Sequence, residues 1–207
     1  MSQYRLYGRR QTGVMAIEAA LIEACLPYDL IDTPRPTTPE EVAAFAAINP
    51  RLQVPVLIHP DGTVITEGPA LLTHIADAAP ASGLIPPPGT PARARHDRWL
   101  AFFHANVYEA MLRELNPARY GDEAAAPAIK AAATAYVRQH FQVFDAELGA
   151  GPHVFGPGFS VLDIYLWMLC YWIDADWLAT TCPRTHSLWT TAQTRPALAQ
   201  VGQAHFG

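Results

Sequence analysis

The chain has 207 residues, of which 50% are hydrophobic and 16% are charged, so it can bury a core and is not an intrinsically disordered protein. Its formal net charge of -5 argues against nucleic acid as the main partner. No apolar stretch reaches the roughly 20 residues that span a bilayer, and the first residues lack the apolar centre of a signal peptide. The cysteines, Cys25, Cys170 and Cys182, are odd in number and far apart, which favours a reducing cytoplasm over a disulfide scaffold.

The N-terminal part alternates strand-like and helix-like segments. Residues 4–7 and 28–32 are short β-favouring runs, and residues 14–24 carry apolar side chains at helical spacing. A polar loop, GRRQTG at 8–13, separates the first strand from the first helix. A short helix is expected from 38–41 onward, because proline suits the first turn and acidic residues favour a helix N-terminus.

Residues 49–73 predict a β-hairpin that leads into a helix. The runs 54–58 and 63–66 flank a Pro-Asp-Gly turn, and Asp-Gly between two β runs is a strong hairpin signal. The helix is expected to begin at Gly68, where unpaired N–H groups and a partial positive charge suit a carboxylate. Strands that alternate with helices, followed by a β-hairpin, indicate a mixed sheet with helices packed on it.

Pro55 is expected at the terminus of the first hairpin strand where the chain turns into the sheet, because proline cannot donate a hydrogen bond to the sheet. Its bond to Val54 is a candidate cis peptide, since the cis penalty before proline is only about 0.5–1 kcal/mol. A turn there leaves the backbone of Val54 outside the sheet ladder, where it could hold an extended ligand as an added strand would.

Proline and glycine crowd the segment after residue 79, which we interpret as a linker between two domains. Residues 1–79 are therefore expected to form an α/β domain, 80–91 the linker and 92–207 an all-α domain. Helical patterns in the second domain cover 92–115, 124–148, 160–173, 184–194 and 196–204. At the start of the apolar helix at 160–173, Ser160 and Asp163 have the spacing of a capping box.

In their order and spacing, these motifs resemble the cytosolic glutathione transferases over nearly the whole chain. The resemblance rests on Asn49-Pro50, Val54-Pro55, Glu67-Gly68, the Ser160–Asp163 box and Arg195-Pro196. It implies a thioredoxin-like βαβαββα domain followed by an all-helical domain, and a homodimer. It also implies that Val54 and Pro55 hold the cysteinyl backbone of glutathione, and that Glu67 and Gly68 bind its γ-glutamyl end. Gly68 departs from the family pattern, which usually has serine there.

A transferase of this kind must stabilise the glutathione thiolate, because a free thiol has a pKa near 8.5. The family uses a serine or cysteine in the loop after the first strand, or a tyrosine within that strand. This loop has neither serine nor cysteine, which leaves Thr12 and Tyr7 as candidates. Thr12 could instead be an ordinary helix cap and Tyr7 a core aromatic. Alternatively, a backbone N–H or Gln11 could stabilise the thiolate, or the protein could lack catalytic activity.

Residues outside these motifs could also contribute to binding. Gln53 could bind the glycyl end of glutathione or simply lie at the surface. Phe103, Val107 and Tyr108 could line a pocket for an apolar co-substrate, although aromatic residues at helical spacing are more often core. The eight histidines are scattered, so no metal site is expected.

The predicted function is transfer of glutathione, as co-substrate, to an electrophilic and largely apolar small molecule. A related glutathione-dependent peroxidase, isomerase or ether-cleaving enzyme is an alternative, as is a non-catalytic binding or regulatory relative. No nucleic acid or membrane is expected as a partner.

Overall fold

The computed structural model describes residues 3–207, which form two compact units. One unit runs through Ile85 and is completed by Gln193–Gly207, and the other is Pro86–Ala192. The sequence had placed everything from 92 to 207 in one helical domain. The last helix, α10 (Pro196–Phe206), belongs instead to the first unit, because its buried face packs on α1 (Val14–Glu23).

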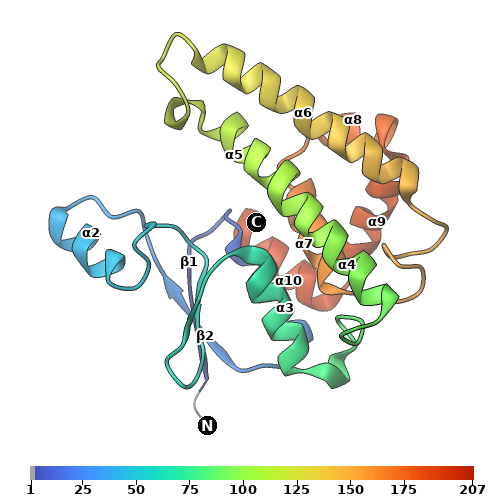
Figure 1. Cartoon of the computed structure of the whole chain (residues 1–207), viewed down its shortest axis with the longest axis horizontal. Helices are drawn as coiled ribbons and strands as arrows, with labels where there is room; N and C mark the ends of the chain where they lie inside the picture. Colours follow the sequence, from blue (N-terminus) through green and yellow to red (C-terminus); the bar gives the residue numbers. More distant parts are fainter. Residues whose placement is uncertain (1–2) are drawn as a thin grey trace. The chain divides into compact units, whose positions relative to one another are not determined.

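The first unit is built on a mixed four-stranded sheet in the order β2-β1-β3-β4. β1 pairs with β2 in parallel and with β3 antiparallel, and β3 pairs with β4 antiparallel. This arrangement is the predicted α/β fold (Figure 1). The strands are β1 (Tyr4–Gly8), β2 (Tyr28–Asp32), β3 (Val56–Ile58) and β4 (Val64–Ile65).

The hairpin strands are shorter than the sequence patterns suggested. β3 begins only at Val56, because Pro55 has no N–H to give to the ladder, and the Val54-Pro55 bond is cis, as expected. The helix after the hairpin, α3 (Gly68–Ala78), begins at the predicted residue and packs against α1. A short 3₁₀ turn, η1 (Pro80–Ser82), follows α3.

The helix α2 (Pro39–Ala46) is mostly exposed and depends on its N-terminal cap. The backbone N–H of Glu41 donates to Thr38 Oγ1 at 3.2 Å, and the Glu41 carboxylate accepts the N–H of Thr38 at 3.2 Å. Phe45 is the residue that α2 buries. This reciprocal cap satisfies two N–H groups that the helix itself cannot pair.

The second unit is helical, and its long predicted first helix is interrupted. Residues 103–108 form a π-helical turn, η2 (Phe103–Tyr108), between α4 (Pro91–Phe102) and α5 (Glu109–Leu115). Such turns inside helices are uncommon and are often found at functional sites. After a 3₁₀ turn, η3 (Pro117–Arg119), the helix α6 (Ala126–Glu147) runs alongside α5 (Figure 1).

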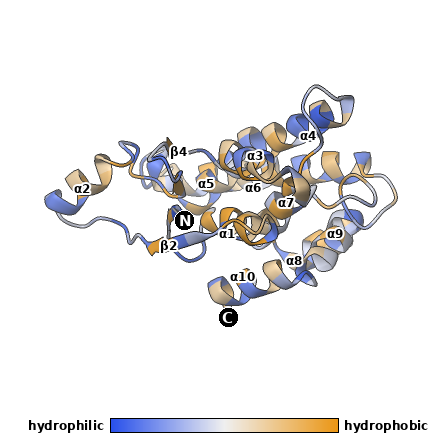
Figure 2. Ribbon diagram, turned by 90° about the horizontal axis from the view of Figure 1, so that it is seen from below, coloured by the Kyte–Doolittle hydropathy of each residue, from blue (hydrophilic) through white to orange (hydrophobic). Residues whose placement is uncertain are grey.

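The helix α7 (Val161–Cys170) is buried at every position, and Figure 2 shows its hydrophobic colouring. The expected capping box is present: Asp163 accepts the backbone N–H of Ser160 at 2.9 Å and its hydroxyl at 2.8 Å. α8 (Ala175–Thr181) was not predicted, because seven residues are too few to show a clear helical period; Asp174 caps it by accepting the Trp177 N–H. α9 (Pro183–Gln193) completes the unit. Among residues 3–207, each helix is too short or too polar to be a candidate membrane span.

Candidate glutathione site

Strand directions bring three predicted segments to the same end of the sheet in the first unit. β1 ends where β3 begins, since Tyr7 pairs with Val56, and β4 ends at the same side, since Ile65 pairs with Leu57. The loop after β1, the residues before β3 and the residues after β4 therefore share one sheet end. These segments contain Thr12, Gln53, Val54, Pro55, Glu67 and Gly68.

The loop after β1 places Thr12 just before α1. The Thr12 hydroxyl donates to the carbonyl of Arg9 at 2.8 Å, and the N–H of Val14 approaches Thr12 Oγ1 at 3.5 Å. The helix cap position itself is Gly13, which has no side chain to cap with. Thr12 therefore lies at the positive end of α1, where a thiolate would be stabilised. To donate to that thiolate, its hydroxyl must turn away from Arg9.

Tyr7, the other candidate, lies in β1 between two strands. The burial of β1 alternates, with Leu6 fully buried and Tyr7 half-buried. Because neighbouring side chains of a strand point to opposite faces, Tyr7 lies on the sheet face opposite Leu6. Tyr7 is thus not part of the buried core on the Leu6 face of the sheet.

The segment before β3 is held by Asn49, whose role the sequence reasoning missed. Asn49 is 5% exposed; its Nδ2 donates to the carbonyl of Gln53 at 2.8 Å, and its Oδ1 accepts the N–H of Arg51 at 3.1 Å. Leu52, between them, has a φ of 55°. The Asn49 side chain thereby shapes the loop that presents Gln53 and Val54. An asparagine directly before a loop proline was the available signal.

Glu67 is the residue that precedes α3, and its backbone is unusual. Its φ of 69° lies in the left-handed region, which is uncommon for a residue with a side chain and is often found at functional sites. Its carboxylate forms an ion pair with Arg51. Gly68 is the first residue of α3, so its N–H lies in the first turn, where intrahelical partners are lacking. This end of α3 can bind a carboxylate, and Glu67 can bind an ammonium group.

The three predicted co-substrate residues lie in η2 of the second unit. Phe103 and Val107 are 0% exposed, and the Phe103 ring packs against Phe144 with 4.7 Å between ring centroids. Tyr108 is only half-buried, and its ring stacks on that of His104. Of these three residues, Tyr108 is therefore the one with surface to offer a ligand.

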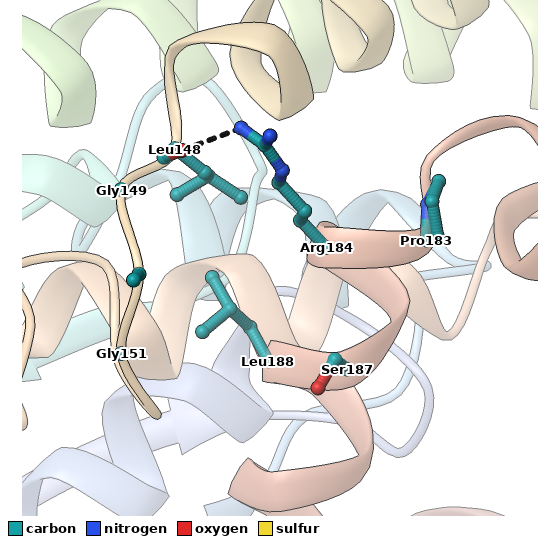
Figure 3. A pocket seen from close by; sticks show the side chains of 8 residues that line it. Leu148, Gly149, Gly151, Pro183, Arg184, Ser187 and Leu188 are labelled. Carbon is teal, nitrogen blue, oxygen red and sulfur yellow. Dashed lines mark hydrogen bonds between the residues drawn. The ribbon is translucent and has the colours of Figure 1, made fainter.

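A cavity of about 460 Å³ lies elsewhere in the second unit (Figure 3). Arg184 borders it and donates from Nη1 to the carbonyl of Leu148 at 2.8 Å. None of the residues predicted to bind glutathione or a co-substrate lines it. We therefore do not assign this cavity to glutathione.

Two family descriptions match the chain. The glutathione S-transferase N-terminal domain matches residues 15–78, and the glutathione S-transferase C-terminal domain matches residues 126–200. The two matches together cover more than half of the chain.

The chain is also similar to individual glutathione transferases. The structure of a Sulfitobacter glutathione transferase homologue with bound glutathione is 26% identical, has a TM-score of 0.86 and aligns over 99% of both chains. A sphingomonad glutathione S-transferase complexed with glutathione is 30% identical, with a TM-score of 0.81 over 97% of this chain and 98% of that one. Glutathione S-transferase GstA of Escherichia coli O157:H7 is 27% identical over 134 residues, which span 63% of this chain and 62% of that protein. The chain belongs to the glutathione S-transferase family.

Proposed function

We propose that this protein is a glutathione transferase that adds the thiolate of glutathione to an electrophilic, largely apolar small molecule. The observation that carries the proposal is the meeting of the Thr12 loop, Val54-Pro55 and Glu67-Gly68 at one end of the sheet. Two relatives of similar fold were solved with glutathione bound, which supports glutathione as the co-substrate here. We further propose that the protein acts as a cytoplasmic homodimer.

Each end of glutathione has a matching group at this end of the sheet. The γ-glutamyl end carries an ammonium and a carboxylate, which suit the Glu67 carboxylate and the first turn of α3. Val54 lies two residues before the first paired residue of β3, where its backbone can pair with the cysteinyl part of the tripeptide. Gln53 takes the glycyl end in this arrangement. Gly68 supplies no hydroxyl, so its N–H alone serves the γ-glutamyl carboxylate.

Thr12 is the better of the two thiolate donors. It precedes α1, whose N-terminal end favours negative charge, whereas Tyr7 lies within the sheet. With the thiolate formed, the reaction needs no redox partner: the sulfur forms a bond to the electrophilic carbon, and the leaving group departs or a proton is taken up.

A second candidate is a non-catalytic glutathione-binding protein. The Thr12 hydroxyl donates to the Arg9 carbonyl, which is the observation that favours it. In this reading the site binds glutathione but does not lower the pKa of its thiol enough for reaction at neutral pH.

Calorimetric titration with glutathione, followed by assay with 1-chloro-2,4-dinitrobenzene, separates these candidates. We expect micromolar to millimolar binding that Glu67→Ala weakens at least about tenfold, the effect of losing one charged hydrogen bond. In the assay, Thr12→Ala should lower kcat while Thr12→Ser retains it, and Tyr7→Phe should have little effect. Binding without turnover would favour the second candidate. No heat at millimolar glutathione would reject both. Size-exclusion chromatography with light scattering tests the homodimer.

A further inference from the structure

The loop that carries Thr12 is tied to the last helix of the chain. The backbone N–H of Gln11 donates to Nδ1 of His205 in α10 at 3.0 Å, across 194 positions of sequence. His205 is 3% exposed, while Gln11 itself is exposed. Gln11 also has a φ of 56°, a left-handed conformation that persists only where surrounding contacts hold it.

This contact assigns the hydrogen-bonding roles of the two ring nitrogens of His205. A backbone N–H can only donate, so Nδ1 of His205 must accept and carries no proton. The proton is on Nε2, which lies 3.1 Å from Oε2 of Glu18 and donates to it. His205 therefore joins the backbone of the loop to a carboxylate on α1 through its two ring nitrogens.

The carboxylate is itself held in place. Glu18 Oε1 accepts the hydroxyl of Tyr28 at 3.1 Å. Burial, together with the charge of Glu18, raises the pKa of Tyr28 well above its usual value, so the phenol keeps its proton and continues to donate. The chain of hydrogen bonds thus runs from β2 through α1 and α10 to the Gln11 backbone, and each donor has one acceptor.

We propose that His205 is a positioning residue for glutathione: by accepting the Gln11 N–H, it holds the loop 9–13 in the conformation that presents Thr12 and the first turn of α1 to the thiol. This inference rests on the proposed glutathione site. His205 lies in the C-terminal helix and belongs to none of the motifs recognised in the sequence. Arg10 supports the same junction, since its Nη2 donates to the carbonyl of Gly207 at 3.4 Å.

Two substitutions of His205 separate its two hydrogen bonds. Asparagine places an amide oxygen near the position of Nδ1, so His205→Asn keeps an acceptor for Gln11 and loses the contact with Glu18. Glutamine reaches the position of Nε2, so His205→Gln keeps the donor to Glu18 and leaves the Gln11 N–H without its acceptor. Each variant loses one of two bonds, so both are expected to lower the melting temperature by a similar amount.

Glutathione binding should distinguish the two variants. His205→Gln is expected to raise the KM and the calorimetric Kd for glutathione about 5- to 10-fold, as the loss of one ordered hydrogen bond would. His205→Asn should change the KM and the Kd for glutathione by less than about twofold. Equal KM and Kd values in the two variants, at matched stability, would mean that His205 only supports the fold and would overturn the proposal.

Amide hydrogen exchange, measured without glutathione, tests the same contact independently of function. In the wild-type protein the Gln11 amide should exchange far more slowly than that of an exposed loop residue. His205→Gln should remove this protection, and Gln11→Gly, which keeps the N–H, should preserve it. Rapid exchange in the wild type would overturn the proposal even if neither His205 variant folds. Slow exchange in a protein that binds no glutathione would reject the proposed function, and with it the positioning role, while confirming the contact.

Discussion

Arg51 and Glu67 form an ion pair that connects the two ends of the β3–β4 hairpin, with 2.5 Å between Arg51 Nη1 and Glu67 Oε1. Their side chains are 57% and 46% exposed, so solvent screens the pair and its contribution to folding is at most about 1 kcal/mol. The pair is therefore better understood as orienting the Glu67 carboxylate at the start of α3 than as stabilising the fold.

Removing Arg51 should weaken glutathione binding and stability only slightly. Arg51→Ala is expected to weaken glutathione binding about threefold while changing the free energy of unfolding by less than about 1 kcal/mol. Arg51→Lys, which retains the charge but not the planar guanidinium, should bind glutathione with an affinity between those of the wild type and Arg51→Ala. Calorimetry and urea unfolding measure the two effects separately. Tighter binding by Arg51→Ala would instead show that Arg51 competes with the ammonium group of the ligand.

Gly8, at the end of β1, should not tolerate a side chain. A Cβ added there would overlap Val14 Cγ2 and lie 2.6 Å from Val14 Cβ. Valine is stiff at χ1 and cannot swing aside, so Gly8→Ala is expected to cost about 1–3 kcal/mol of folding free energy and to lower the melting temperature by several degrees. Gly149→Ala is the matched control, since an added Cβ there meets nothing within 4 Å. Val14→Ala on the Gly8→Ala background should restore part of the loss; an unchanged melting temperature in Gly8→Ala would contradict this packing.

His96 should make the protein less stable in mild acid. It is 0% exposed, and no hydrogen-bond partner of its Nε2 is found among residues 3–207. Burial lowers the pKa of His96 below 6.5, although the hydrogen bond to Asp97 opposes the shift. The unfolded chain therefore binds more protons between the folded pKa and 6.5, so stability is complete above 6.5 and falls as the pH drops through that window.

Urea unfolding from pH 7.5 to pH 5 tests this expectation. His96→Phe keeps an aromatic ring opposite Phe155, whose ring centroid lies 6.1 Å from that of His96, and should flatten the dependence on pH. Some dependence should remain, because burial also lowers the pKa of His74. A slope in His96→Phe equal to that of wild type would show that His96 does not contribute.

The cysteines should differ sharply in reactivity. Cys25 is exposed, whereas Cys170 and Cys182 are buried. Burial raises the pKa of the Cys182 thiol to about 11, with Asp145 adding to the effect, and raises the pKa of Cys170 further. Because the thiolate is the reactive form, Ellman's reagent at pH 8 should label Cys25 rapidly and the other two only after unfolding. Cys25→Ser should remove the rapid phase, and a second rapid equivalent in that variant would contradict the assignment.

The sequence by itself determined the features that depend on neighbouring residues. The hairpin around Asp61-Gly62, the start of α3 at Gly68 and the Ser160–Asp163 cap all follow from turn preferences and from hydrogen bonds that close within a few positions. The candidate residues Thr12, Val54 and Glu67 were also identified from local motifs, and the order of the strands places their segments at one end of the sheet.

Only the tertiary structure decided the features that depend on distant residues. α10 joins the first unit because Arg195 pairs with Glu23 of α1 at 2.9 and 2.6 Å, and His205 meets Gln11 in the same way, 194 positions apart. The burial of Phe103 against Phe144 likewise depends on α6, which the helical period of 92–115 does not contain. A sequence pattern indicates which face of a segment is apolar, but it does not indicate which other segment packs on that face. For this reason the sequence could offer candidate ligand-binding residues, but it could not offer the residue that we propose positions their loop.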